Sequence, residues 1–334
     1  MEVISDRPAS PTFYAVAGRL LFVECTDLRL GNLIERLFTG WQLTPVVPAG
    51  QSSDIRIKFF CGDDPLEIPR NLNQFEIAEG GQCYTDGADY YLTLGDSLLR
   101  LQNKNPITVD LWLRELPVPD DPMLARMTSF AVCAALRRFG LFELHSAGVV
   151  HPESEEGVLI VGPSGSGKST IALQLAIAGW PYLSDDELLL SVVDDAVEAR
   201  GFRSFFAVSS ETAVAARIDK IGGLSISKQL KTCFEPDVVL GSSQRSSATP
   251  GSLFFIGLGG EYKSQINKLT QAETMTRLIR ACPWATYDTA IASANLNVLS
   301  KLARQTRGFS LLAGRDLLEP HCASDLLLRY LGAD

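Results

Sequence analysis

The chain has 334 residues, of which 46% are hydrophobic and 21% charged, and its formal net charge is −9. This composition is ordinary for a soluble globular protein, and the length predicts two domains. The charge argues against binding to nucleic acid or to an anionic membrane, and no segment approaches the ~18 consecutive apolar residues of a membrane span.

The cysteines and the N-terminus predict a cytoplasmic protein. The seven cysteines form no C-x-x-C pair, and their number is odd, so we interpret them as reduced thiols. The first residues lack the charged-then-apolar order of a signal peptide. Three histidines, together with these cysteine spacings, predict no zinc site.

Residues 1–116 are predicted to form a smaller α+β domain. Strands are expected at residues 12–24, 55–59, 82–85, 90–94 and 107–113. Asp27 is placed to cap a helix, and Asp86-Gly87 indicates a hairpin. We expect a small antiparallel sheet with one helix and no catalytic group, serving recognition, docking or dimerisation.

A proline-rich segment, residues 117–122, is the predicted linker. Asp121 and Pro122 suit the first positions of a helix that reaches about residue 139, so a second domain is expected at 123–334. Further strands of this domain are expected at residues 144–150, 157–161, 181–190 and 252–258, and helices at 171–178, about 288–305 and about 323–331. Thr270-x-x-Glu273 is a capping box that opens another helix. The segment between residues 199 and 250 is rich in loop residues.

The motif that carries most chemistry is the run Gly162–Thr170, which fits the phosphate-binding pattern G-x-x-x-x-G-K-[ST]. An apolar strand precedes it and a helix follows, as this loop requires. Its backbone N–H groups and the helix N-terminus favour an anion, Lys168 can reach the β- and γ-phosphates, and Ser169 can bind Mg²⁺. The predicted nucleotide-binding residues are Gly162, Ser164, Gly165, Ser166, Gly167, Lys168, Ser169 and Thr170.

Acidic residues and a histidine complete the predicted site. Asp185 follows Lys168 by 17 positions, at the end of a short β-like segment after one helix. One carboxylate of the pair Asp185-Asp186 can hold Mg²⁺ and the other can accept a proton from a hydroxyl; the alternative is a pair of helix caps. His145, on the preceding strand, has either a catalytic or a structural role. Glu198 is either a further metal ligand or part of a solvated charged edge.

Taken together, these residues resemble the HPr kinase/phosphorylase family, and especially its members outside sugar regulation. The similarity covers about residues 144–201. It implies an α/β phosphate-loop kinase fold shared with ATP-dependent phosphoenolpyruvate carboxykinases, and phosphorylation of a serine hydroxyl. It further implies that Lys168 and Ser169 hold the triphosphate and metal, that Asp185 is the base, and that Asp186 supports the metal.

Two departures from the family pattern limit what the resemblance implies. Thr170 stands where the family kinase has Glu, and no long basic segment linked to dephosphorylation is recognisable. The resemblance therefore implies neither phosphorylase activity nor HPr as the acceptor. Some relatives in ribosomal-peptide clusters phosphorylate a precursor peptide, such as the terminal serine of a lasso precursor, which gives a plausible substrate class.

The predicted function is thus an ATP- or GTP- and Mg²⁺-dependent kinase acting on a Ser/Thr hydroxyl of a peptide or protein. Two alternatives stay open: a small-molecule kinase of the shikimate or nucleotide kinase type, and a non-catalytic nucleotide-binding scaffold. The oligomeric state, monomer or homo-oligomer, is left open by the sequence.

Overall fold

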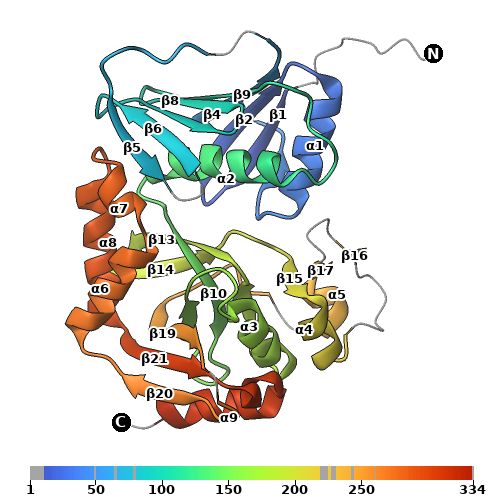
Figure 1. Ribbon diagram of the computed structural model, residues 1–334, viewed down its shortest axis with the longest axis vertical. Helices are drawn as coiled ribbons and strands as arrows, with labels where there is room; N and C mark the ends of the chain where they lie inside the picture. Colours follow the sequence, from blue (N-terminus) through green and yellow to red (C-terminus); the bar gives the residue numbers. More distant parts are fainter. Residues whose placement is uncertain are drawn as a thin grey trace. The chain divides into compact units, whose positions relative to one another are not determined.

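The computed structural model describes residues 11–48, 50–63, 66–77, 80–218, 225–226, 231–241, 244–259 and 261–332. The chain is a mixed α/β protein that divides into two compact units, each with its own large sheet (Figure 1). Unit 1 comprises Met1–Leu141 with Tyr287–Ile291, and unit 2 comprises Phe142–Thr286 with Ala292–Asp334. No helix in the described ranges is long and apolar enough to cross a membrane.

The described residues of unit 1 form one nine-stranded sheet in the order β3-β1-β2-β4-β9-β8-β7-β6-β5. The strands are β1 Thr12–Val16, β2 Arg19–Cys25, β3 Thr44–Val46, β4 Ile55–Cys61, β5 Asn73–Ile77, β6 Gly81–Thr85, β7 Tyr90–Leu94, β8 Ser97–Gln102 and β9 Ile107–Leu113. Strands β2, β4 and β9 are parallel neighbours, so the sheet is mixed and larger than the small antiparallel sheet we expected. The strand expected at residues 12–24 is two strands, because Ala17 and Gly18 adopt positive φ angles and reverse the chain.

Two helices pack on strands of this sheet. Helix α1 spans Leu28–Thr39, and the Asp27 side chain caps it by accepting the N–H groups of Arg29 and Leu30, as predicted. Helix α2 spans Pro122–Arg137, with Asp121 as its N-cap. We expected α2 to open the second domain after a linker at 117–122, but it packs against β4, β8 and β9 and so belongs to unit 1.

The short segment 287–291 returns to unit 1 late in the chain. An ion pair holds it there: the Asp288 carboxylate lies 2.6 Å from Arg138 and 3.6 Å from Arg137, and all three side chains are buried. The ring of Tyr287 also stacks on Phe75, with 5.2 Å between centroids. These contacts join residues that are far apart in the chain, so no local sequence pattern predicts them.

In unit 2, the described residues form a second large sheet in the order β18-β14-β13-β10-β11-β19-β21-β20, with β12 also paired to β10. Its strands are β10 Phe142–Val150, β11 Gly157–Val161, β12 Tyr182–Ser184, β13 Glu187–Val193, β14 Ala196–Gly201, β18 Ser247–Ala248, β19 Pro250–Leu258, β20 Gln265–Lys268 and β21 Arg307–Ala313. Strands β11, β19 and β21 are parallel, and β10 pairs antiparallel to its neighbours.

Helices cover both faces of this sheet (Figure 1). They are α3 Lys168–Ile177, α6 Gln271–Ala281, α7 Trp284–Tyr287, α8 Ala292–Gln305, the 3₁₀ helix η2 Arg315–Leu318 and α9 Pro320–Leu331. Successive residues of β19 point to opposite faces. Phe254 and Ile256 therefore join the cluster with α3 and α9, while Phe255 lies under Arg277 of α6. The expected capping box, Thr270 with Glu273, opens α6.

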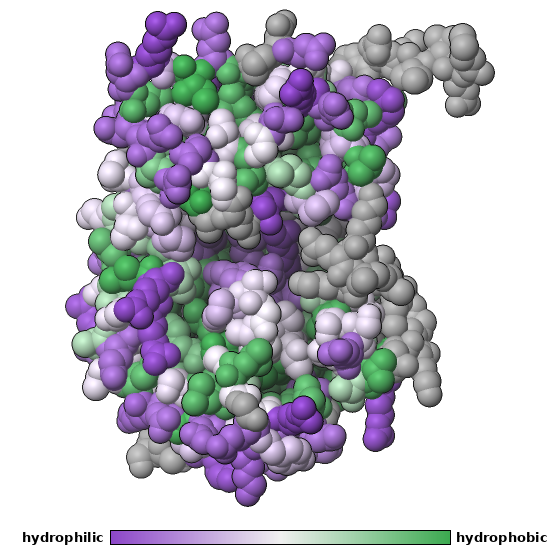
Figure 2. Space-filling model, viewed as in Figure 1, coloured by the Kyte–Doolittle hydropathy of each residue, from purple (hydrophilic) through white to green (hydrophobic). Residues whose placement is uncertain are grey.

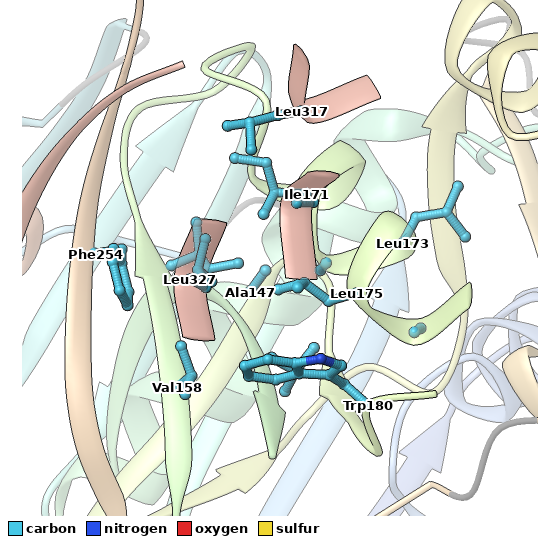
Figure 3. Packing of buried hydrophobic residues seen from close by; sticks show 14 of the residues in the cluster. Ala147, Val158, Ile171, Leu173, Leu175, Trp180, Phe254, Leu317 and Leu327 are labelled. Carbon is cyan, nitrogen blue, oxygen red and sulfur yellow. The ribbon is translucent and has the colours of Figure 1, made fainter. Parts of the chain in front are cut away.

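The core on the α3 face fixes the helix that starts at the phosphate loop. Figure 3 shows Ile171, Leu173 and Leu175 of α3 among side chains from the strands and from the C-terminal helices. Trp180 is 1% exposed, and its indole N–H donates to Ser324 Oγ at 2.9 Å. Burying this many large apolar side chains holds α3 in one orientation on β10 and β11.

A small sheet follows in the segment that we expected to be rich in loops. Its described strands are β15 Phe206–Ser209, β16 Ser225–Ile226 and β17 Lys231–Phe234, accompanied by α4 Ser210–Ala215 and α5 Pro236–Leu240. Phe206 and Phe234 stack at 5.4 Å between centroids, and both belong to the core beside α3. Part of this segment lies outside the described residues.

The surface is mixed in polarity, and the cysteines form no disulfide bonds. Figure 2 shows hydrophilic and hydrophobic side chains interspersed over the visible face of each unit. All seven cysteines are free thiols. Burial raises the pKa of Cys25 and of Cys83 to about 12, so these two thiols stay protonated and unreactive near neutral pH.

Candidate functional site

The predicted phosphate loop connects β11 to α3, at the carboxyl end of the parallel strands of unit 2. This edge of a parallel sheet is where α/β proteins bind ligands. Two loop glycines have φ angles that other residues rarely adopt, +79° at Gly165 and +96° at Gly167. Gly162 is required for a different reason: a Cβ there would lie 2.6 Å from the Ile256 side chain and 2.9 Å from its carbonyl oxygen.

The first turn of α3 is open to an anion. Its N-cap, Gly167, has no side chain to accept a hydrogen bond from the helix. The first N–H groups of a helix have no intrahelical acceptor, and the helix dipole adds partial positive charge at this end. Ser166 Oγ is also buried and has no hydrogen-bond partner among the described residues. The loop therefore has donors to offer to phosphate oxygens.

Lys168 points back into the loop rather than into solvent. It is 5% exposed, and its ammonium donates to the carbonyl oxygens of Gly162 and Pro163 at 2.9 and 3.0 Å. The same ammonium lies 2.9 Å from Nε2 of His145. A lysine ammonium can only donate, so Nε2 must be the acceptor and the proton of the neutral imidazole sits on Nδ1.

His145 connects this lysine to the acidic pair. Strand β10 places His145 opposite Glu187 of β13, next to the acidic turn. Nδ1 of His145 lies 3.2 Å from Oδ1 of Asp186, so the imidazole donates to that carboxylate. Both side chains are almost half exposed, at 43% and 49%. A continuous polar path thus runs from the Lys168 ammonium through an imidazole to a solvent-accessible carboxylate.

Asp185 lies on the buried side of the same turn. It is 2% exposed, and its Oδ2 accepts the Ala207 N–H at 2.8 Å. Ser169 Oγ donates to the Asp185 backbone carbonyl at 3.3 Å, so the loop serine and the acidic turn are in contact. Burial, followed by the charge of Asp185, raises the pKa of Tyr182 well above its ordinary value, and this phenol remains neutral.

Thr170 contacts residues that the sequence did not indicate. Its hydroxyl lies 3.1 Å from Thr212 Oγ1, which in turn lies 3.0 Å from Ser209 Oγ. Ser209 is the N-cap of α4. A chain of hydroxyl groups therefore ties the first turn of α3 to the small sheet and α4. No sequence signal marks Thr212, because hydroxyl residues are common at helix starts.

Glu198 is not brought to this cluster. It lies on β14 opposite Ser191 of β13, four positions along β13 from Glu187, the residue that pairs with His145. Four residues of a strand span roughly 13 Å. The Glu198 carboxylate pairs instead with Arg200 at 2.9 Å. This matches the solvated charged edge that was its alternative interpretation.

The cluster without Glu198 has side chains that fit a nucleotide with Mg²⁺. Across the described part of the chain, no group of three or more His, Cys, Asp or Glu side chains is placed to hold a metal by itself. Mg²⁺ commonly binds one or two protein oxygens and completes its shell with phosphate oxygens and water. Ser169 and the acidic pair would supply such oxygens, and Mg²⁺ held there would neutralise charge on the phosphates.

The structure thus brings together Lys168, Ser169, His145 and the pair Asp185-Asp186, all predicted as site residues. Spacing alone did not indicate which acid faces His145 and which is buried. It also did not indicate the backbone N–H of Ala207 that binds Asp185.

Comparisons with known proteins add little to this geometry. No protein-family model and no curated protein matches the sequence. Among solved structures, the Hpr(Ser) kinase/phosphatase from Coxiella burnetii is similar over 57% of this chain and 90% of that chain. The sequence identity is 12% and the TM-score is 0.31, a likeness too low to assign the fold.

Proposed function

We propose that this protein is a Mg²⁺-dependent nucleoside-triphosphate kinase that transfers a phosphoryl group to a hydroxyl of a peptide or protein. The observation that carries the proposal is the contact of Lys168 with His145, and of His145 with Asp186, at the end of a glycine-rich loop. A lysine for phosphate charge and an accessible carboxylate for a hydroxyl proton are the two groups that phosphoryl transfer to an alcohol needs.

Three side chains of the loop and the N-terminus of α3 have distinct roles in this proposal. The N–H groups at the start of α3 bind phosphate oxygens, and Lys168 exchanges its carbonyl contacts for the β- and γ-phosphates. Ser169, beside Asp185, holds the metal side of the site. Ser166 Oγ, buried without a partner among the described residues, gains an acceptor when a phosphate is bound.

The exposures of the two acids lead us to exchange the roles expected from sequence. A general base must reach the substrate hydroxyl. Asp186 is accessible and aligned by His145, whereas Asp185 is buried and already accepts the Ala207 N–H. We therefore propose that Asp186 accepts the proton. Asp185 would contribute to Mg²⁺ binding, and its hydrogen bond to Ala207 holds β15 in place.

A peptide or protein acceptor is the favoured substrate class. The residues around the loop resemble HPr-kinase-like proteins, whose acceptors are serine hydroxyl groups of proteins. The described residues of unit 1 form a nine-stranded sheet of their own, and this unit contains none of the residues proposed for the phosphate site. Presenting a surface to an acceptor is the role that we propose for this unit.

Transfer of labelled phosphate tests the proposal directly. The full chain is incubated with γ-³²P-ATP or GTP and Mg²⁺, with serine-containing peptides in one arm and hydroxyl-bearing metabolites in the other. Label on a peptide hydroxyl supports the proposal. Label on a metabolite only would establish a small-molecule kinase, and nucleotide binding without transfer to any acceptor would establish a scaffold.

A further inference from the structure

A cavity in unit 1 contains none of the residues proposed for phosphoryl transfer. Its volume is about 540 Å³, and residues of β4, β8 and β9 line it together with the segment that follows β4. Small-ligand sites in proteins measure roughly 300–1,000 Å³. The cavity is therefore large enough for an amino-acid-sized ligand or the end of a peptide.

The sheet register builds the floor of this cavity from charged residues. Lys58 of β4 lies opposite Asp110 of β9, and Asp110 lies opposite Arg100 of β8, so the three side chains share one face of the sheet. Arg100 donates through both Nε and Nη2 to Oδ2 of Asp110, at 3.1 and 2.5 Å. Asp110 thus balances the charge of one of the two cations.

Two of the residues that line the cavity carry a donor without an acceptor. Among the described residues, Lys58 has no ion pair within 4.0 Å. Trp112, only 7% exposed, has a buried indole N–H without a hydrogen-bond partner in the same set of residues. Burying such a donor unpaired costs free energy, so an acceptor supplied by a ligand would stabilise this arrangement.

Apolar groups form the other wall. Phe60 lies opposite Trp112, two register positions beyond the Lys58–Asp110 pair, and Leu66 packs against the same cluster. Among the described residues, one further carboxylate lines the cavity: Asp63, which is exposed and screened by water. The cavity lining therefore combines the Lys58 side chain, which no carboxylate of the described residues pairs, and a buried N–H donor with an aromatic wall.

We propose that this cavity binds a carboxylate that carries a neighbouring apolar side chain. The carboxylate would accept from Lys58 and the Trp112 N–H, and the apolar group would pack on Phe60 and Leu66. A free N-acyl amino acid and the C-terminal residue of a peptide both have this chemistry. The inference does not depend on phosphoryl transfer, because binding is measured without nucleotide.

The test uses the full chain and two matched probes, N-acetyl-L-phenylalanine and its amide, which differ in the carboxylate. Calorimetry should detect the acid and show binding at least about tenfold weaker for the amide, since charge-assisted hydrogen bonds are the strong ones. The Trp112 indole N–H signal, assigned by its loss in Trp112→Phe, should shift on adding the acid. Equal binding of acid and amide, absence of binding, or an unchanged Trp112 signal would overturn the proposal.

Substitutions test whether Lys58 binds the carboxylate. Lys58→Met should weaken binding of the acid by about tenfold or more while leaving binding of the amide unchanged. Lys104→Met is the matched control, because Lys104 is an exposed lysine of the same unit outside the cavity, and it should bind like the parent. Lys58→Gln repeats the test if the methionine variant loses its native circular dichroism spectrum. Unchanged affinity in a folded Lys58 variant contradicts the assignment.

One further probe distinguishes the source of the carboxylate. An acetylated tetrapeptide ending in phenylalanine is compared with N-acetyl-L-phenylalanine. Tighter binding of the tetrapeptide assigns the cavity to a peptide C-terminus, and tighter binding of the single residue assigns it to a small acid. Because no nucleotide is present, the result stands whether or not the loop at Lys168 supports phosphoryl transfer.

Discussion

The ammonium of Lys168 lies 2.9 Å from Nε2 of His145, although 23 positions separate the two residues in the chain. Strand β10 carries the histidine and the first turn of α3 carries the lysine. Because the ammonium donates, this contact fixes the imidazole tautomer and directs the Nδ1 proton at Asp186. Protonating His145 would remove the acceptor on Nε2 and break the path between the lysine and the carboxylate.

Lys168→Met should reduce phosphoryl transfer by a factor of about 10³ or more, because the loop lysine neutralises charge that develops on the phosphates. Initial rates with labelled nucleotide measure the loss. Lys268→Met, an exposed lysine on β20, controls for the change of charge alone. Near-normal turnover in the Lys168 variant would refute the nucleotide-site assignment.

Asp186→Asn and Asp185→Asn should differ in their effects. Removing the accessible proton acceptor should lower the rate about 10²-fold or more while nucleotide affinity is retained. Asp185→Asn should instead weaken Mg²⁺-dependent nucleotide binding. Rates and equilibrium binding, measured on both variants, separate the two roles. If Asp185→Asn alone loses transfer with intact binding, the base is Asp185, as the sequence first indicated.

Ser169→Ala should weaken nucleotide binding in the presence of Mg²⁺ more than in EDTA. The hydroxyl that contacts the acidic turn is lost, whereas the backbone N–H groups that bind phosphate are retained. Titration of a fluorescent nucleotide with and without metal gives both affinities. A loss of equal size in the two conditions argues against a role in metal binding.

Gly162→Ala should lower both the thermal midpoint and nucleotide affinity. The new Cβ would lie 2.6 Å from the Ile256 side chain and 2.9 Å from its carbonyl, and a backbone atom cannot move away cheaply. Gly257→Ala, on β19, is the control, because its Cβ would meet only the Leu312 side chain at 3.6 Å. Similar midpoints for the two variants would show that the loop tolerates the extra carbon.

Asp288→Ala should destabilise the protein by about 3–5 kcal/mol, because it leaves two buried arginine side chains without their shared carboxylate. The free energy of unfolding in urea measures the change. Asp96→Ala removes an exposed partner of Arg114 in the same unit and should cost less than about 1 kcal/mol. Comparable losses for both variants would mean that segment 287–291 is not held by this ion pair.

Local patterns predicted much of the secondary structure. Asp27 and Thr270 mark the starts of their helices because short polar side chains satisfy free N–H groups there. The Asp86-Gly87 turn joins β6 and β7 as expected. Such signals depend on neighbouring residues only.

Two features of unit 1 were not predicted. The turn at Ala17-Gly18 was missed because the apolar alternation continues through both strands. The parallel pairing of β2, β4 and β9 was missed because it joins segments that are distant in the chain.

The sequence by itself determined the candidate phosphate loop, because the motif of glycines, lysine and hydroxyl residues is contained in nine consecutive positions. It also identified His145 and the acidic pair as candidates. Only the tertiary structure decided which carboxylate faces the imidazole, since the direction of each side chain depends on how β10, β13 and β15 pair and pack. The separation of Glu198 from the loop and the place of α2 in unit 1 were likewise decided by sheet register and apolar packing. Sheet register and apolar packing depend on contacts between residues far apart in the chain, so no local sequence pattern predicts them.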